Sequence, residues 1–317
     1  MAAEVGDDVY GEDPTVNKLE AIAAEKTGME ASIFVSSGTQ SNLLALMSHC
    51  QRGDEYIVGQ GAHTYRYEGG GAAVLGSIQP QPLDFEEDGT LALEKVKGAI
   101  KPDDFHFAKT RLFCLENTQS GKILPLQYLS DAAKLARKHN LGFHLDGARV
   151  FNAAVGLKID IGEISGFFDS VSVCLSKGLG APIGSVLCGK KELIDTARRW
   201  RKVLGGGMRQ AGILAAAGLY ALENHVERLE EDHANADYLA LGLSQIEEVS
   251  VASGCAQTNM VFFSVSDNHI LPLTAFLENR RILIYPGSSI RLVTHLDISK
   301  EDITSVIDSI KAYFKSV

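Results

Sequence analysis

The chain of 317 residues lacks a long apolar run, a long basic cluster and a paired-cysteine motif. No segment approaches the roughly 18 consecutive apolar residues of a membrane-spanning helix, and the first residues lack the basic and apolar regions of a secretory signal. The formal net charge of −10 disfavours nucleic acids and anionic membranes as partners. A small molecule is therefore the expected ligand.

The five cysteines are scattered, odd in number and without a Cys-x-x-Cys pair. This usage predicts neither a disulfide framework nor a zinc site, and we expect no metal centre. Cysteines in apolar, strand-like runs are typical of buried, reduced thiols. The pattern favours a cytoplasmic location.

Strand-like and helix-like segments alternate along most of the chain. Asp13 and Pro14 are typical of a helix start, and Gly28 is typical of the stop. Further helices are expected at 43–47 and 130–139, and strands at 31–35, 56–58, 111–115, 141–145 and 170–175. This alternation predicts an α/β fold with a mostly parallel sheet.

The pattern changes toward the C-terminus. A long helical stretch is expected at 208–246, helices at 271–279 and 300–314, and strands at 258–265, 281–285 and 291–294. We therefore predict a large domain at 1–232 and a small α+β domain at 233–317. Neither a linker rich in proline or serine nor an internal repeat marks the boundary.

Lys177 and Asp146 each follow an apolar, strand-like run and each precede a glycine. Their separation, 177 − 146 = 31 residues, leaves room for one crossover, so both can lie at the same edge of a sheet. Either residue alone is more typical of a solvated turn. Together they favour pyridoxal phosphate (PLP) chemistry, which needs a lysine amine and an acid that protonates the pyridine nitrogen.

The segment 36–42 lies between an expected strand and an expected helix. Its backbone N–H groups and the helix dipole favour an anion, and Gly38 permits close approach of the backbone to a phosphate. An ordinary helix cap at Ser36 or Ser37 is the alternative. The segment matches neither a nucleotide P-loop nor a dinucleotide-binding motif.

Five motifs in this order and spacing closely resemble low-specificity L-threonine aldolase, a fold-type-I PLP enzyme. They are the segments 7–15, 37–42, 144–149, 176–180 and 205–210. The resemblance covers essentially the whole chain. It implies a fold-type-I, PLP-dependent transferase-like fold, PLP as cofactor, and a homodimer or homotetramer with active sites at the dimer interface.

The resemblance also implies roles for individual residues. Lys177 would bind PLP covalently, Asp146 would keep its pyridine nitrogen protonated, and His63 would stack on its ring. The implied cofactor-binding set is Ser37, Gly38, Thr39, Gln40, His63, Asp146, Arg149, Lys177, Lys202 and Arg209, and the implied substrate-binding set is Tyr10, His106, Arg149 and Arg291. Without the resemblance, His63 would be a loop histidine and His106 a polar residue between two aromatic ones. Asn117 and Thr118 are further candidates to line the cofactor.

The implied reaction is retro-aldol cleavage of L-threonine or L-allo-threonine to glycine and acetaldehyde, a step of threonine catabolism and glycine formation. Lys177, His63, His106 and Asp146 would be catalytic, and either histidine could accept the β-hydroxyl proton, as could a water or the cofactor phosphate. The alternatives are another reaction of the same fold type, such as serine hydroxymethyl transfer, transamination or β-elimination, and a non-catalytic relative. The family usually carries an additional N-terminal segment before 7–15, so we expect a truncated N-terminus.

Overall fold

The computed structural model describes residues 3–252 and 256–317; Cys255 lies outside these ranges. The chain divides into two compact units, Met1–Val226 and Glu227–Val317. The expected boundary at 232/233 lies a few residues later, inside helix α11 (Leu229–Ser244). A helix is one cooperative unit, so α11 belongs entirely to the second unit.

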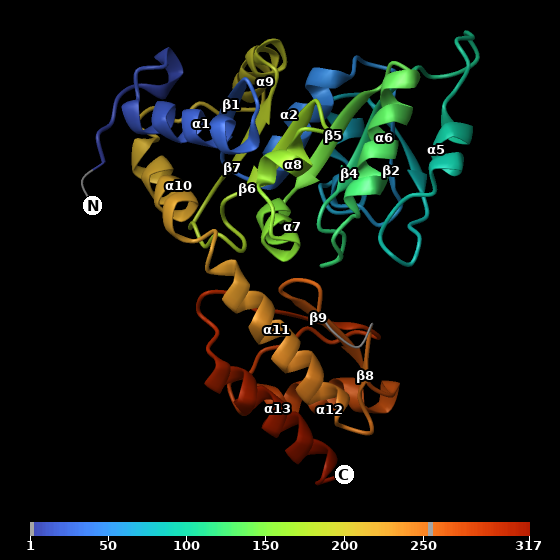
Figure 1. The fold of residues 1–317 in the computed structure, drawn as a ribbon, viewed down its shortest axis with the longest axis vertical. Coiled ribbons are helices and arrows are strands. Elements are labelled where there is room, and N and C mark those ends of the chain that lie inside the picture. The colour runs from blue at the N-terminus through green and yellow to red at the C-terminus, as the bar shows by residue number, and fades with distance from the viewer. Residues whose placement is uncertain (1–2, 253–255) are drawn as a thin grey trace. The chain divides into compact units, whose positions relative to one another are not determined.

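The first unit contains a seven-stranded sheet among its described residues (Figure 1). Its spatial order is β1 (Ala31–Val35), β7 (Ser185–Gly189), β6 (Ser170–Cys174), β5 (Gly142–Gly147), β4 (Thr110–Glu116), β2 (Glu55–Gly59) and β3 (Gln79–Leu83). β7 runs antiparallel to both of its neighbours, and the remaining pairs are parallel. The expected α/β fold with a mostly parallel sheet is confirmed.

Helices cover both faces of this sheet (Figure 1). α2 (Gly38–His49) and α9 (Lys191–Val203) pack on one face against Ile33, Val35 and Leu187. α1 (Pro14–Thr27) and α6 (Leu126–Lys138) lie on the other face. The other described helices of this unit are η1 (Asp8–Tyr10), α3 (His63–Arg66), α4 (Gly71–Val74), α5 (Leu93–Ala99), α7 (Val150–Leu157), α8 (Ile161–Ser165) and α10 (Gly212–Asn224).

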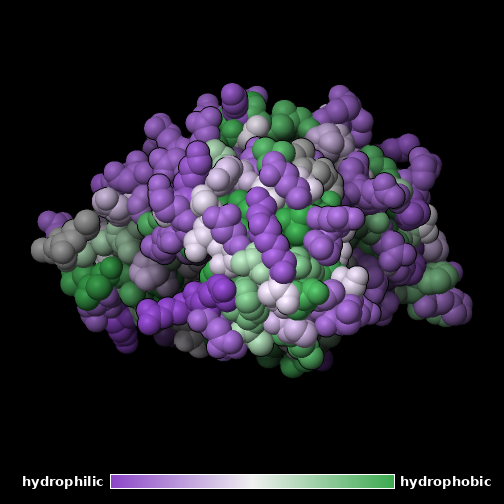
Figure 2. All heavy atoms as spheres, turned by 90° about the horizontal axis from the view of Figure 1, so that it is seen from below, coloured by the Kyte–Doolittle hydropathy of each residue, from purple (hydrophilic) through white to green (hydrophobic). Residues whose placement is uncertain are grey.

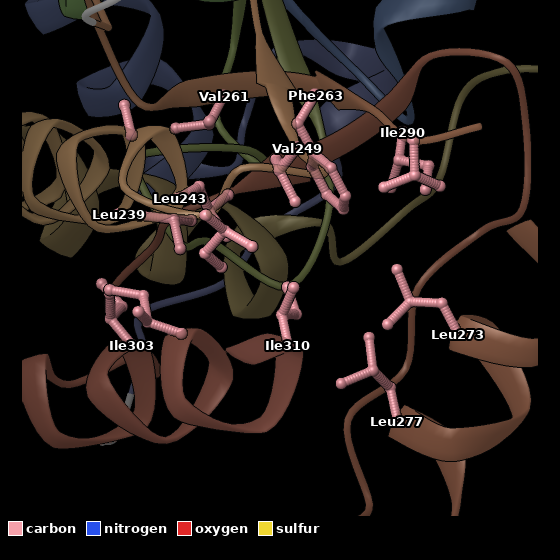
Figure 3. Packing of buried hydrophobic residues seen from close by; sticks show 14 of the residues in the cluster. Leu239, Leu243, Val249, Val261, Phe263, Leu273, Leu277, Ile290, Ile303 and Ile310 are labelled. Atoms are coloured by element: carbon pink, nitrogen blue, oxygen red, sulfur yellow. The ribbon is translucent and has the colours of Figure 1, made fainter. Parts of the chain in front are cut away.

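The second unit combines a small antiparallel sheet with three helices among its described residues. The sheet order is β10 (Ile290–Val293), β9 (Met260–Ser264) and β8 (Ser250–Val251), and the helices are α11, α12 (Asp267–Glu278) and α13 (Lys300–Phe314). Leu243, Phe263 and Ile310 meet in its hydrophobic core together with residues of α12 (Figure 3). This unit has the expected α+β composition.

Local sequence patterns predicted the bounds of several elements correctly. α1 is capped by the Asp13 carboxylate and ends at Gly28, which has a φ of 66°, as the sequence predicts. The expected long helix at 208–246 is wrong, because 225–228 separate α10 from α11. The expected strand at 281–285 is also wrong. Ile282 and Ile284 pack against the core and Leu283 and Tyr285 are exposed, so the side chains alternate as in a strand, but no described strand pairs with them.

The helices and the surface of the protein agree with the lack of long apolar runs in the sequence. Among the described residues, no helix is both long and apolar enough to cross a membrane. On the face drawn in Figure 2, hydrophilic side chains predominate and hydrophobic ones are interspersed among them.

Candidate active site

Asp146 and Lys177 lie at the carboxyl ends of two neighbouring parallel strands. Asp146 is in β5, which pairs with β6, and Lys177 follows β6 in the connection to β7. Lys177 is close enough to His63 and Glu116 to oppose a rise in the pKa of each. The structure thus brings Asp146, Lys177 and His63 to one edge of the sheet.

The connection that carries Lys177 is a short return between antiparallel strands. The Gly180 N–H donates to the Lys177 carbonyl at 2.9 Å, and the Ala181 N–H donates to the Leu175 carbonyl at 3.0 Å. The Leu175 N–H in turn donates to the Gly184 carbonyl at 3.0 Å. Backbone hydrogen bonds therefore hold the segment on both sides of the lysine.

The Asp146 carboxylate is buried and accepts a hydrogen bond on each oxygen. Asn42 donates its amide to Oδ2 at 2.9 Å, and the Ala148 N–H donates to Oδ1 at 3.0 Å. Such donors satisfy a buried carboxylate that would otherwise be costly to desolvate. Asp146 can therefore present a fixed acidic group at this edge.

His63 begins α3 between two carboxylates. Its backbone N–H donates to Glu116 at 2.9 Å, and its Nδ1 lies 2.8 Å from Oε1 of Glu68. The hydrogen bond to Glu68 raises the pKa of His63. One ring nitrogen of His63 and one oxygen each of Glu68 and Asp146 lie within 4.8 Å of one another, so the imidazole is held close to the Asp146 carboxylate.

Both neighbouring glutamates have unusual acidity. Burial raises the pKa of Glu68. Burial, together with the nearby Asp146, raises the pKa of Glu116 to about 7. The site therefore contains several groups that can exchange protons near neutral pH.

Two histidines lie behind Asn42, of which His144 is buried and His49 half-buried. His144 Nε2 is 3.3 Å from the Asn42 Oδ1, and Ser170 Oγ is 2.8 Å from both His144 Nδ1 and His49 Nε2. Burial lowers the pKa of His144 to about 3 and that of His49 to about 4. Both imidazoles are neutral at physiological pH.

The expected phosphate-binding segment is the N-terminus of α2. The Ser37 hydroxyl accepts from the Gln40 N–H at 3.1 Å, and the Gln40 side chain accepts from the Ser36 N–H at 3.0 Å. Ser37 is thus the helix cap, as the alternative interpretation predicted, and α2 still begins with backbone N–H groups at Gly38 and Thr39. A cavity of about 240 Å³ adjoins this terminus and is lined by Ser36, Gln40, Arg201 and the Gly205–Gly207 turn, among others.

Two buried polar side chains at the same edge have atoms without a protein hydrogen bond. These atoms are the Asn117 Nδ2 and the Thr118 Oγ1, for which the described residues supply no partner. They lie next to Asp146, because the Asn117 N–H donates to the Asp146 carbonyl at 3.0 Å. Unpaired buried donors are costly, and a polar ligand would satisfy them. Together with Lys177 and Asp146, they fit a polar heteroaromatic cofactor.

His106, which the resemblance implies for the site, lies away from Asp146, Lys177 and His63. His106 is on the exposed segment that leads into the amino end of β4, whereas Asp146 is at the carboxyl end of the adjacent parallel strand. The His106 side chain is 68% exposed and its Nδ1 contacts Asp104 at 2.7 Å. The structure therefore does not bring His106 to Asp146 within the first unit, because β4 separates them by roughly 20 Å of extended chain.

Tyr10, Lys202 and Arg209 gather around the Gly205–Gly207 turn. The Arg209 guanidinium pairs with Asp7 and lies over the Tyr10 ring at 5.7 Å, and Lys202 passes beside Gly207. All three side chains are exposed. Arg149 is half-buried and precedes α7, next to the end of β5. Arg291 is an exposed residue of β10 in the second unit.

The sequence did not single out Asn42, Glu68, Glu116 or His144 as site residues. Asn42 and His144 fall within motifs that were noted for their neighbours, and Glu116 directly follows the strand expected at 111–115. Glu68 carries only a weak signal, namely the three glycines that follow it. Gly69 and Gly70 adopt φ of 63° and 68°, a conformation that glycine adopts easily.

Comparisons with known proteins show the family of this chain. The model of the family described as "Beta-eliminating lyase" matches residues 1–266. Low specificity L-threonine aldolase of Escherichia coli K12 is 54% identical over 313 residues, which cover 99% of this chain and 93% of that protein. Low-specificity L-threonine aldolase 1 of Arabidopsis thaliana is 43% identical over 312 residues, covering 95% and 87%.

Solved structures show the same fold. Threonine aldolase of Leishmania major superposes with a TM-score of 0.83 at 22% identity, covering 98% of this chain and 92% of that one. Serine palmitoyltransferase of Sphingomonas wittichii superposes with a TM-score of 0.78 at 18% identity, covering 99% and 80%. The fold alone therefore accommodates more than one reaction, and the residues of the site must distinguish between them.

Proposed function

Because the chain belongs to the β-eliminating lyase family and to the low-specificity L-threonine aldolases within it, we propose that it cleaves L-threonine and L-allo-threonine to glycine and acetaldehyde. The observation that carries this proposal is the cluster of Lys177, Asp146 and His63 at one sheet edge. It combines an amine, a buried acid and an imidazole within reach of one small ligand.

PLP is the cofactor that these residues fit. Lys177 would bind it covalently, Asp146 would accept the proton of its pyridine nitrogen in a hydrogen bond, and the start of α2 with Ser37, Gly38, Thr39 and Gln40 would hold its phosphate. Asn117 and Thr118 offer the unpaired donors described above. When bound, PLP supplies the electron sink that C–C bond cleavage requires.

The protein's own groups manage the proton and the substrate. His63 accepts the proton of the β-hydroxyl, and its raised pKa keeps it a good base. Arg149, next to the end of β5, would bind the substrate carboxylate, for which a planar guanidinium is well suited. Arg291 is proposed for the same role from the sequence resemblance alone.

We further propose a homodimer or homotetramer with the active sites at an interface. The side chains of His106, Tyr10, Lys202 and Arg209 are exposed, and this supports the arrangement. Exposed polar side chains that do not contact Lys177, Asp146 or His63 of their own chain can complete the site of a neighbouring copy. His106 would then approach the substrate hydroxyl from that copy, and Lys202 and Arg209 would approach the cofactor phosphate.

A cytoplasmic location and a role in threonine catabolism and glycine formation are part of the same proposal. The free, buried thiols of Cys50, Cys114, Cys174 and Cys188 support a reducing compartment.

The visible spectrum of the purified protein, recorded with PLP before and after addition of threonine or glycine, tests cofactor, lysine and substrate together. We expect an absorbance near ~420 nm, a borohydride-trapped adduct on Lys177, and acetaldehyde release from threonine. Formation of a keto acid without acetaldehyde would indicate another reaction of the same fold type. Absence of both the absorbance and the adduct would indicate a non-catalytic relative.

A further inference from the structure

One amide bridges two carboxylates in the site. The Asn42 Nδ2 donates to Oε1 of Glu68 at 2.8 Å and to Oδ2 of Asp146 at 2.9 Å. Both protons of this amide are therefore used, and its Oδ1 must be the atom that faces Nε2 of His144.

The direction of the hydrogen bonds behind Asn42 follows from this orientation. Since Oδ1 of Asn42 accepts, Nε2 of His144 carries its proton. Because His144 is neutral, its Nδ1 is unprotonated and accepts from the Ser170 hydroxyl, which leaves Ser170 Oγ to accept from Nε2 of His49. The hydrogen bonds from His49 to Ser170, from Ser170 to His144 and from His144 to Asn42 therefore fix the orientation of the Asn42 amide. In this orientation its Nδ2 donates to Glu68 and Asp146.

Glu68 thus receives a fixed donor from Asn42 on its Oε1. The same oxygen, Oε1, faces the Nδ1 of His63 at 2.8 Å, and the Glu68 side chain is only 4% exposed, against 40% for His63. A buried carboxylate held in this way selects the imidazole tautomer with the proton on Nδ1. Nε2, on the opposite side of the ring, is then the nitrogen that can accept a proton.

Resting on the function proposed above, we propose that Glu68 is a positioning residue: it fixes the tautomer of His63 so that Nε2 takes the proton of the substrate β-hydroxyl, and it stabilises the imidazolium that results. In this step the hydroxyl O–H bond breaks and an Nε2–H bond forms, and the Nδ1 proton remains on the ring. Asn42 donates to both Glu68 and Asp146, and Glu68 contacts His63, so these hydrogen bonds also fix the position of His63 relative to Asp146.

Five charged or titratable groups among the described residues face His63. They are Tyr67 and Glu68 after α3, Glu116 of β4, Asp146 of β5 and Lys177 after β6, and the Tyr67 ring lies 5.9 Å from the His63 ring. Glu68, Glu116 and Asp146 favour the protonated imidazole and Lys177 opposes it, but in the described structure only Glu68 contacts the ring nitrogen. This difference gives a matched control, because Glu116 contacts only the backbone N–H of His63.

The decisive measurement is ¹⁵N NMR of the histidine side chains in PLP-free protein, with His63 assigned by comparison with His63→Gln. We expect neutral His63 in the wild type to carry its proton on Nδ1. We expect Glu68→Gln to lower the pKa of His63 through loss of the charged acceptor and to weaken the preference for this tautomer. A wild-type tautomer with the proton on Nε2 would overturn the proposal, and this result requires no variant to fold.

Kinetics separate positioning from general structural damage. With PLP bound, Glu68→Gln should lower kcat by about ten- to a hundredfold with KM nearly unchanged, and Glu68→Asp should recover part of the loss because the charge is retained. The acid limb of the kcat profile should move to lower pH in Glu68→Gln. Equal effects of Glu116→Gln on the tautomer would overturn the proposal by showing that any nearby carboxylate suffices. If the wild type released no acetaldehyde, the proposed function would fail, whereas the NMR result would still decide the role of Glu68.

Discussion

The sheet-edge site of the first unit and the hydrophobic cluster of the second unit bury very different kinds of groups. At the sheet edge of the first unit, the buried side chains include Asn42, Glu68, Asp146 and His144, joined by hydrogen bonds. The second unit contains a hydrophobic cluster of aliphatic and aromatic side chains, among them Leu243, Phe263 and Ile310. Buried polar groups cost stability unless they are paired, whereas buried apolar groups contribute it directly. The site is therefore expected to determine activity and the hydrophobic cluster to contribute stability, and the predictions below test this division.

The largest expected effect is on activity alone. Lys177→Ala should reduce turnover by at least about a thousandfold, because the amine that binds the cofactor is lost. Lys177 is half-buried in a short return and makes no core contact of the kind seen in the second unit, so the unfolding midpoint of the PLP-free protein should change little. Steady-state kinetics and denaturant titration measure the two quantities. Retained activity would refute the assignment of Lys177.

The converse change should affect stability alone. Leu243 is fully buried in the second unit, and Leu243→Ala should lower the free energy of unfolding by about 2–5 kcal/mol through lost burial and a cavity. Urea unfolding followed by circular dichroism measures this loss. We expect kcat per folded molecule to remain near the wild-type value, and a large fall in kcat would contradict the division between the units.

The pH dependence of stability should reveal the lowered pKa of His49 in the first unit. The pKa of His49 is lowered by burial to about 4 in the folded state, against roughly 6.5 when unfolded. The unfolded state therefore binds more protons between these values, and the wild type loses about 1.4 kcal/mol per pH unit from this group as the pH falls.

His49→Gln removes this pH-dependent contribution of His49 to the free energy of unfolding. The stability difference between wild type and variant should consequently shift in favour of the variant as the pH falls from about 6 to about 4.5, by about 1.4 kcal/mol per unit. Comparing the two proteins cancels the opposite contribution of Glu116, whose pKa is raised to about 7 by burial and by Asp146. A pH-independent difference would show that His49 is not buried as a neutral group.

The smallest expected effect concerns a helix cap. Ser299 caps α13 in a reciprocal capping box with Asp302, and Ser299→Ala should cost about 1 kcal/mol in unfolding free energy. The same urea titration can resolve it. A change in kcat would not be expected, because the cap belongs to the second unit and carries no group of the site.

Local features made part of this structure predictable. α1 follows from its cap and stop signals, and the neighbouring positions of Asp146 and Lys177 follow from the single crossover between parallel strands. These signals depend on residues close in sequence, or on a topological rule that holds in most sheets.

Other features depend on partners that sequence does not reveal. Residues 281–285 alternate like a strand but have no neighbouring strand to pair with, and β7 reverses direction between two strands that are parallel to each other. Glu68 acquires its role only because Asn42, 26 positions away in sequence, directs an amide at it. Such non-local contacts give no periodicity or spacing that could have identified them.

The connection between β6 and β7 should tolerate few insertions or deletions. Cys174 pairs with Ser185 across the two strands, and hydrogen bonds from Leu175 and Ala181 close the segment between them. Adding or deleting one residue here would either shift the strand register, which turns buried side chains to the other face, or move the Lys177 amine. We therefore expect 175–184 to be among the connections of this sheet least tolerant of insertions, whereas the exposed segment before β4 should accept them more readily.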